Sequence, residues 1–336
     1  MWTLRNRTAY AAERNWIRDT QGVHWWLVAV QATFTVGRDG RLSLADEQPP
    51  PVLEPEYFGE PGQSSLRRDS DLLERKPGTD VLVLGSAHAP RGRPARSVPV
   101  VLRVGALEKQ LVVFGSRVYV DVAMGLSTTS PQPFVQQPVR YELAFGGGNL
   151  TDPDPARQQL DERNPVGRGF PPQPARLRNQ PAHCVEYASG SAASRGPAGF
   201  GPIDRGWLPR RTLAGTYDAA WVEKKKPLLP DDYDPRFAQC APADQRTPAP
   251  LVGGERIGVL NMNVEGTLVV EVPRVALRLT SVIGRARQDH GAQVSTVVVE
   301  PSERRVSVVW QSALRVPAPS VDYLDWTEID EQRGAG

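Results

Sequence analysis

The stretch VHWWLVAVQATFTV at Val23–Val36 decides the fold class. Every second residue from Trp26 to Val36 is apolar, and alternate side chains of a β-strand lie on the same face. This pattern predicts a strand with one face in a hydrophobic core. The GRDGR turn at Gly37–Arg41 ends the strand, and the proline-rich segment Glu47–Tyr57 predicts an extended connection.

Similar short strands are expected on both sides of a less regular middle. They are Asp80–Leu84, Val98–Val104, Leu111–Phe114, Arg117–Val122, Val139–Phe145, Arg256–Leu260, Thr267–Val272, Val275–Thr280, Val294–Val299 and Val306–Gln311. The last two predict a hairpin through the EPSERR turn. The acidic stretch DYLDWTEIDEQ at Asp322–Gln332 predicts a short terminal helix.

The composition favours short strands over long helices. The chain of 336 residues contains 32 prolines and 30 glycines, which disfavour long helices, together with 40% hydrophobic residues and eight tryptophans, which are typical of a folded protein. We therefore predict a mainly β fold with a sandwich-like antiparallel core, a long ordered irregular segment and few short helices.

The irregular segment covers residues 147–254. It is rich in proline and has no period of 2 or 3.6, yet aromatic residues recur along it and predict that it packs on the sheets. We expect residues 1–336 to form one interwoven β domain, with strands in 1–146 and 255–320 and a tail at 321–336. Two domains with separate cores are the alternative.

Charge and hydropathy exclude two classes of partner. The 40 Lys and Arg residues nearly balance the 38 Asp and Glu residues, and the two signs are interspersed, which gives no support to nucleic-acid binding. No apolar run approaches the length of a membrane span, and the N-terminus lacks the apolar region of a signal peptide. We expect a cytoplasmic protein without membrane insertion.

The residues that usually carry catalysis lack the required spacing. Cys184 and Cys240 are far apart without a CxxC motif, which argues against a disulfide or a zinc site. Asp231–Asp234 lacks the spaced ligands of a calcium loop, and no Lys-Ser/Thr follows Gly146–Gly148, as a phosphate loop would require. The histidines, also without partners at useful spacing, are His24, His88, His183 and His290. We predict no catalytic residue, metal or cofactor.

Ordered motifs along nearly the whole chain resemble a bacterial family of unknown-function domains encoded next to type VI secretion effectors with PAAR-like tips. They are KPGTDVLVLGSAHAP (76–90), VFGSRVY (113–119), YELAFGG (141–147), NPVGRGF (164–170), PAGFGPIDRGWLPR (197–210), GTYDAAW (215–221), LPDDYDPRF (229–237), APADQR (241–246) and RRVSVVWQ (304–311).

The resemblance implies an adaptor or chaperone that holds a PAAR-like effector in the producing cell and helps load it on the VgrG spike. It brings no catalytic residues with it. Two alternatives stay open: a carboxylate-dependent β-sandwich hydrolase using Asp218 and Asp234, which needs two carboxyls about 5–10 Å apart in a cleft, and a structural spike component secreted with its cargo.

Two groups of motif residues receive specific predictions. Polar residues are expected to satisfy backbone groups of the irregular segment, and these are Asp218, Asp232, Asp234 and Arg236. Interface centres favour aromatic residues and arginine, so the predicted partner-binding residues are Phe170, Trp207, Arg210, Tyr217, Trp221 and Phe237.

Overall fold

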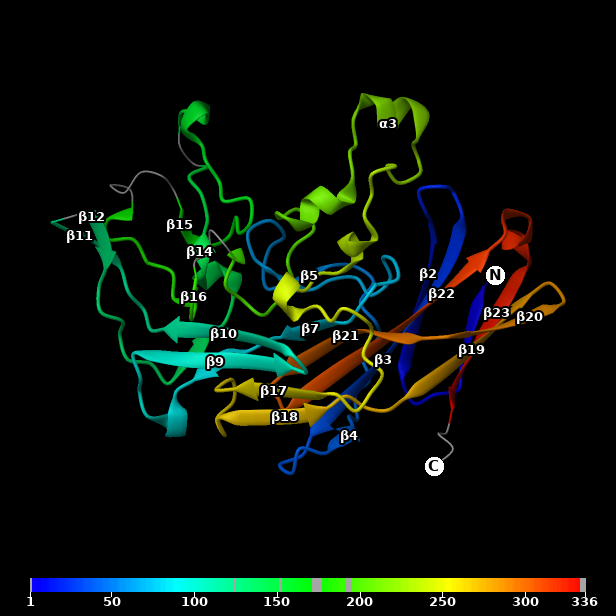
Figure 1. Ribbon diagram of the computed structural model, residues 1–336, viewed down its shortest axis with the longest axis horizontal. Helices are drawn as coiled ribbons and strands as arrows, with labels where there is room; N and C mark the ends of the chain where they lie inside the picture. The colour runs from blue at the N-terminus through cyan, green and yellow to red at the C-terminus, as the bar shows by residue number, and fades with distance from the viewer. Residues whose placement is uncertain (1, 124, 151–152, 171–176, 191–194, 333–336) are drawn as a thin grey trace.

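The computed structural model describes residues 2–123, 125–150, 153–170, 177–190 and 195–332, and it is mainly β (Figure 1). The largest sheet has the order β2 (Ala11–Arg18), β3 (His24–Val36), β22 (Arg305–Val316), β21 (Gln293–Glu300) and β7 (Asp80–Val83), with β4 (Leu42–Leu44) paired to β3. Within it, Val30 of β3 lies opposite Trp310 of β22. Strands from the two ends of the chain therefore share one sheet.

Two further sheets are also built from distant segments. The second sheet has the order β16 (Val185–Tyr187), β10 (Leu107–Phe114), β9 (Ser97–Val104), β17 (Arg256–Leu260) and β18 (Thr267–Glu271). The third has the order β1 (Thr3–Asn6), β23 (Leu324–Gln332), β19 (Ala276–Ile283) and β20 (Ala286–Gly291). Most of the pairings in these three sheets are antiparallel, with β1–β23 and β21–β7 as the parallel exceptions.

The remaining elements of the described ranges are short. The paired strands are β5 (Glu56–Tyr57) with β6 (Leu66–Arg68), β8 (Ser86–His88) with β13 (Gln136–Pro138), β11 (Tyr119–Val122) with β12 (Gly125–Thr128), and β14 (Phe145–Gly146) with β15 (Arg168–Gly169). The helices are α3 (Ala219–Lys224) and the 3₁₀ turns Pro90–Gly92, Tyr141–Leu143, Pro155–Arg157, Arg210–Ala214, Pro235–Ala238, Ala243–Gln245 and Ala318–Tyr323. No helix in the described ranges is long and apolar enough to cross a membrane.

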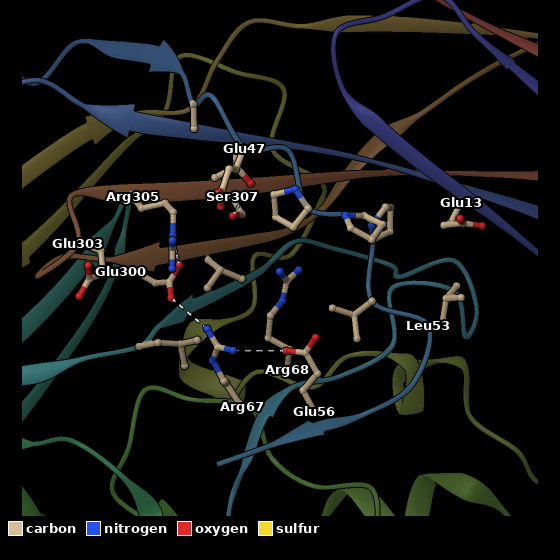
Figure 2. A pocket seen from close by; sticks show the side chains of 18 of the residues that line it. Glu13, Glu47, Leu53, Glu56, Arg67, Arg68, Glu300, Glu303, Arg305 and Ser307 are labelled. Atoms are coloured by element: carbon tan, nitrogen blue, oxygen red, sulfur yellow. Dashed lines mark hydrogen bonds and ion pairs between the residues drawn. The ribbon is translucent and has the colours of Figure 1, made fainter. Parts of the chain in front are cut away.

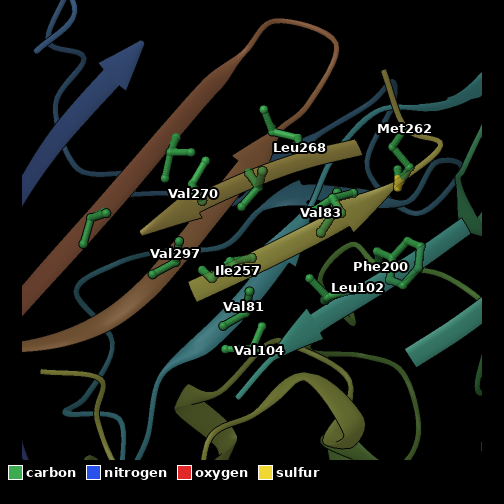
Figure 3. Packing of buried hydrophobic residues seen from close by; sticks show 14 of the residues in the cluster. Val81, Val83, Leu102, Val104, Phe200, Ile257, Met262, Leu268, Val270 and Val297 are labelled. Carbon is green, nitrogen blue, oxygen red and sulfur yellow. The ribbon is translucent and has the colours of Figure 1, made fainter. Parts of the chain in front are cut away.

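The main hydrophobic core lies between the first and second sheets (Figure 3). Val83 of β7 and Val297 of β21 belong to the same buried cluster as Leu102 of β9 and Ile257 of β17. The apolar face of β3, which includes Val30, joins this cluster as the sequence predicts. Burial of one face of each sheet is the arrangement that stabilises a sandwich.

The opposite face of β3 is buried as well. Leu27 and Ala29 pack with Leu72 and with Val309 of β22 in a separate cluster. The side-chain amide of Gln31 donates to the carbonyl oxygen of Pro49 at 2.9 Å. The proline-rich connection after β4 therefore covers the outer face of the first sheet.

Every predicted strand except one coincides over most of its length with an observed strand, and the predicted hairpin is the β21–β22 pair. The exception is Val139–Phe145, which forms a 3₁₀ turn at Tyr141–Leu143. Asn164 Nδ2 donates to the carbonyl oxygens of Tyr141 and Phe145, both at 2.9 Å, and so supplies bonds that a sheet neighbour would otherwise make.

The predicted terminal helix at Asp322–Gln332 is also wrong, because Leu324–Gln332 forms strand β23. This strand lies between β1 and β19, where Ile329 is opposite Leu279 and both are fully buried. Thr327 and Ile329 are both fully buried, because they share the face of β23 that alternation directs towards the core. Pairing on both sides outweighs the helical pattern of the isolated segment.

Buried charged groups fasten the irregular segment to the sheets. Lys76 Nζ lies 2.8 Å from Asp80 Oδ2, and the same carboxylate oxygen accepts a hydrogen bond from the backbone N–H of Cys240. The side-chain amide of Gln245 donates to the carbonyl oxygens of Val81 and Phe200. These contacts explain why polar motif residues recur in a segment without periodicity.

Candidate functional site

A loop at residues 215–230, here called the arm, carries helix α3 away from the sheets (Figure 1). Asp218 caps the helix, because its Oδ1 accepts a hydrogen bond from the backbone N–H of Trp221 at 2.9 Å. The indole N–H of Trp221 donates to the carbonyl oxygen of Leu228 at 2.9 Å and ties the two sides of the arm together. The rings of Tyr217 and Trp221 meet edge to face with centroids 4.7 Å apart.

The base of the arm is held by aspartates. Asp232 accepts hydrogen bonds from the backbone N–H of Thr216 at 2.9 Å and from its hydroxyl at 2.7 Å, which lower the pKa of Asp232. Asp234 accepts from the backbone N–H and the guanidinium of Arg236, and this side-chain contact lowers the pKa of Asp234. The structure thus places all four predicted fastening residues in short-range polar contacts at the arm.

The arm exposes apolar surface. Tyr217 is 52% exposed and Val222 is 56% exposed. Trp221 is partly buried within the arm, as is Phe237 at its base. Phe170 is partly buried on a different segment, beside β15. The structure therefore brings Tyr217, Trp221 and Phe237 into one region and leaves Phe170 outside it.

Trp207 and Arg210 do not fit the predicted partner-binding set, because the core encloses them. Trp207 is 6% exposed and packs edge to face with Tyr141. Arg210 is 1% exposed and donates to Asp69 and to the carbonyl oxygen of Ile203. Neither side chain can touch a partner in this conformation, and their role is to hold the irregular segment on the sheets.

A groove beside the arm was not foreseen from the sequence; we call it the Trp25 groove. Its lining residues come from β2, β3, β22 and the segments around Glu74 and Tyr233, and its volume is about 430 Å³. The indole N–H of Trp25 donates to Asp19 Oδ2 at 2.9 Å. The one sequence signal is Trp25, the first tryptophan of the WW pair, because Trp25 and Trp26 must lie on opposite faces of the strand and Trp26 is on the predicted core face.

A second, charged groove of about 710 Å³ lies on the outer side of the first sheet (Figure 2). Arg67 lies between two carboxylates of its lining, with Nη1 3.7 Å from Glu56 and Nη2 3.6 Å from Glu300. Arg305 binds Glu300 from the other side at 2.7 Å. Guanidinium groups thus engage both Glu56 and Glu300 in this groove.

The two carboxylates that the sequence suggested for a hydrolase lie outside the charged groove. Asp218 and Asp234 do not line the charged groove, and both accept backbone hydrogen bonds. A general acid needs a raised pKa, whereas Arg236 lowers the pKa of Asp234. The geometry at these two residues is that of caps and turns.

The family of uncharacterized proteins conserved in bacteria, DUF2169, has a model that matches residues 21–311. The chain belongs to this family. No curated protein and no solved structure gives a match.

The DUF2169 match includes the arm and most of both grooves, but not β1 or β23. Trp25, Glu74 and Tyr233 of the Trp25 groove all lie within it. The arm and the two grooves are therefore built largely from residues that the family model covers.

In this DUF2169 chain, both cysteines are buried and His183 is held by hydrogen bonds to neighbouring side chains. Cys184 and Cys240 are buried and free, and burial raises both thiol pKa values, that of Cys240 to about 12. Thiolates are the reactive form, so these cysteines are poor nucleophiles. His183 lies between the hydroxyl of Tyr119 at 2.8 Å and Glu186 at 3.0 Å. No group of three or more His, Cys, Asp and Glu in the described ranges is placed to hold a metal ion.

Proposed function

We propose that this DUF2169 protein is a non-catalytic adaptor of a type VI secretion system, which binds a PAAR-like effector and helps load it on the VgrG spike. The observation that carries the proposal is the arm, a capped helix with exposed apolar side chains on a rigid β scaffold. Binding surfaces of this kind bury a few aromatic and aliphatic anchors. The motif resemblance supplies the identity of the partners.

The energetic argument rests on Tyr217 and Val222. Both are more than half exposed, and covering them removes apolar surface from water, which is worth roughly 25 cal/mol per Å². The Asp218 cap and the Trp221–Leu228 hydrogen bond fix the arm in advance. A partner therefore loses little free energy in ordering this surface when it binds.

The proposed mechanism is stoichiometric. In the producing cell's cytoplasm the adaptor covers apolar surface on the tip domain or a transmembrane segment of the effector, and releases it as the spike assembles. No bond is made or broken. The contacts of Asp218 and Asp234 with backbone groups favour this mechanism over carboxylate catalysis.

The test is an affinity pull-down of the tagged protein from its native host under secretion-active conditions, followed by mass spectrometry. We expect a PAAR-like effector or VgrG to co-purify, and we expect a variant carrying Tyr217→Ser and Val222→Ser to lose it. Recovery of neither partner, in cells shown to express both, would overturn the proposal.

The location of the protein gives a second readout. An adaptor stays largely in the producing cell, whereas a secreted spike component accumulates in the medium. Immunoblots of cells and medium from the same culture, with VgrG as the secreted reference, separate the two. Accumulation of the protein in the medium in proportion to VgrG would contradict the adaptor role.

A further inference from the structure

Strand β2 forms a free edge of the largest sheet. It pairs with β3 on one side only, over eight residues that contain no proline and no shift of register. The opposite edge of the same sheet is covered. There the backbone N–H of Val83 in β7 donates to the carbonyl oxygen of Phe200, and the side-chain amide of Gln245 donates to that of Val81. Among the described residues, no such cover lies on the edge of β2.

The register of β2 decides which of its backbone groups point outward. The N–H of Asp19 donates to the carbonyl oxygen of Val23, and this pair continues the β2–β3 register. Hydrogen-bonded pairs alternate along an antiparallel ladder, so every second residue of β2 turns its N–H and C=O away from β3. These residues are Ala12, Arg14, Trp16 and Arg18.

Most of these outward backbone groups have no partner within the described ranges. The exception is the N–H of Trp16, which donates to the side-chain oxygen of Asn15 at 2.8 Å. An extended polypeptide carries donors and acceptors at the same spacing as a strand edge. The edge of β2 can therefore accept a further strand, which is a common mode of peptide recognition.

Trp16 presents an exposed aromatic ring at the middle of this edge. The side chain is 49% exposed. Its ring stacks on His24 with centroids 5.1 Å apart, and its indole N–H donates to His24 Nδ1 at 3.0 Å. These contacts fix the ring in advance and leave part of it free for a partner.

Two arginines on either side of Trp16 make the edge cationic. Arg14 and Arg18 share the face of Trp16, because alternate residues of a strand lie on one side. Neither has a carboxylate partner among the described residues, and the guanidinium of Arg14 lies over the ring of Trp2, 5.8 Å from its centroid. The neighbouring acids Glu13 and Asp19 line the grooves of the opposite face.

We propose that the edge of β2 binds an extended acidic segment of a partner protein, which adds to the sheet as an antiparallel strand. Two carboxylates four positions apart in the segment face Arg14 and Arg18, and the apolar side chain midway between them packs on Trp16. Cross-strand pairs of opposite charge and of aromatic with aliphatic side chains stabilise such an arrangement. A second copy of β2 fits less well, because the same face of its edge carries two arginines and no carboxylate.

The edge is continuous with the arm. The tip of the β2–β3 hairpin lies beside it (Figure 1), and a Cβ at Gly22 would be 3.4 Å from Leu228 Cδ1 of the arm. A segment bound along β2 can therefore continue onto the arm. The identity of the protein that carries the segment rests on the proposed function, under which it is the effector. The recognition of an acidic strand stands on the edge of β2 alone.

The experiment uses the full chain, labelled with ²H and ¹⁵N, and two peptides that alternate as strands do. The probe is acetyl-Glu-Thr-Val-Thr-Glu-Thr-Val-amide, whose glutamates face Arg18 and Arg14 in the antiparallel register and whose first valine faces Trp16. The control peptide has lysine in place of both glutamates. We expect the probe to bind saturably at millimolar concentration and the lysine peptide to bind at least tenfold more weakly.

Hydrogen exchange distinguishes strand addition from contact between side chains alone. The amide protons of Ala12, Arg14 and Arg18 have no acceptor in the free protein and should exchange rapidly. Saturation with the probe should slow their exchange at least tenfold. The amides of Glu13 and Ile17, which face β3, should be protected with and without the probe.

A charge-reversed variant assigns the selectivity to the two arginines. Arg14→Glu combined with Arg18→Glu should reverse the preference, so that the lysine peptide binds at least tenfold more tightly than the probe. Arg38→Glu is the control, since it changes an exposed arginine in the turn between β3 and β4, and both titrations should stay unchanged. An unchanged unfolding midpoint for both variants shows that the fold is intact.

Equal binding of the two peptides, no added protection of the edge amides, or an unchanged preference in the charge-reversed variant would each overturn the inference. Slow exchange of the edge amides in the free protein, together with the mass of a dimer in light scattering, would assign the edge to a second copy and overturn it as well. Probe binding without recovery of an effector or VgrG in the pull-down would keep the strand site and remove the adaptor role. Recovery of a partner without probe binding would keep the adaptor role and remove the strand site.

Discussion

The guanidinium of Arg210 lies 2.5 Å from the carboxylate of Asp69, although 141 positions separate the two residues in the sequence. Both side chains are buried, and Arg205 binds the same carboxylate at 2.6 Å. Burial alone would raise the pKa of Asp69, but the two guanidinium groups outweigh it and lower that pKa. The pair joins the segment before β7 to the irregular middle of the chain.

Asp69→Ala should therefore be strongly destabilising, because it leaves the buried charge of Arg210 without a partner. We expect a loss of about 3–5 kcal/mol in the free energy of unfolding. The measurement is urea-induced unfolding at neutral pH. Glu162→Ala is the matched control, since it removes an exposed ion pair with Arg211 and should cost less than about 1 kcal/mol. Equal losses of unfolding free energy in the two variants would show that the buried ion pair contributes no more to stability than the exposed one.

His290 should make the stability pH-dependent. Its ring is bonded to the hydroxyls of Ser281 at 2.9 Å and Ser312 at 2.7 Å, and burial lowers its pKa to about 4. In the unfolded chain a histidine titrates near pH 6.5. Between these values the unfolded state binds a proton that the folded state does not, so stability falls as the pH is lowered.

We expect His290 to account for about 2 kcal/mol of stability lost between about pH 6.5 and pH 4. His290→Gln removes this titration, and its unfolding free energy should vary less over the same interval. Urea titrations of both proteins at four pH values give the comparison. Parallel pH profiles for the wild type and the variant would contradict the assignment.

Gly115 should not tolerate a side chain. A Cβ at this position would lie 1.8 Å from the carbonyl oxygen of Gln132, which is backbone and cannot turn aside. We expect Gly115→Ala to lower the unfolding free energy by about 2 kcal/mol or more. Gly258→Ala in β17 meets no atom within 4 Å and should be nearly neutral. Thermal unfolding of the two variants side by side tests the contrast.

Asp218→Ala should loosen the arm without unfolding the protein. The loss of a helix cap costs about 1 kcal/mol, which raises the open population of α3 about fivefold. Trypsin reports this opening by cleavage after Lys224 and Lys225 in the arm. Asp218→Asn retains the capping oxygen and should be cleaved at nearly the wild-type rate. Equal cleavage of both variants would show that the cap does not hold the arm.

Exposed side chains of the arm should affect partner binding and not stability. Tyr217→Ser with Val222→Ser should weaken binding of the PAAR-like effector at least tenfold, because each anchor contributes about 1 kcal/mol or more. Val264→Ser is the control, since it changes an exposed valine on the turn between β17 and β18. Biolayer interferometry with purified effector gives the affinities. Unchanged affinity in a folded arm variant would move the binding surface elsewhere.

Local sequence determines much of this fold. The alternation in Val23–Val36 is strong enough to identify β3, because a strand with a continuous apolar face has few other ways to bury it. The hairpin β21–β22 is readable for the same reason. Proline density correctly indicates that long helices are absent from the described ranges.

Tertiary structure decides what local patterns leave undetermined. The segment Val139–Phe145 alternates like a strand, yet Asn164 takes up its carbonyl groups and bends it into a turn. The tail at Leu324–Gln332 has the pattern of a helix. It nevertheless forms a strand, because it pairs with β1 on one side and with β19 on the other. In both cases the partners are distant in sequence, and their hydrogen bonds outweigh propensity.

The sequence by itself thus determined the β class and the main strands, and its motifs include Asp218, Asp232 and Asp234, whose carboxylates accept backbone hydrogen bonds. Only the tertiary structure decided which of those residues face a partner. Trp207 and Arg210 are of the residue types that are common at interface centres, but both side chains are buried in the core. The Trp25 groove exists only because Trp25 and Tyr233, which are distant in sequence, line it together. Exposure is a property of the packed chain, because it depends on neighbours that sequence spacing does not specify.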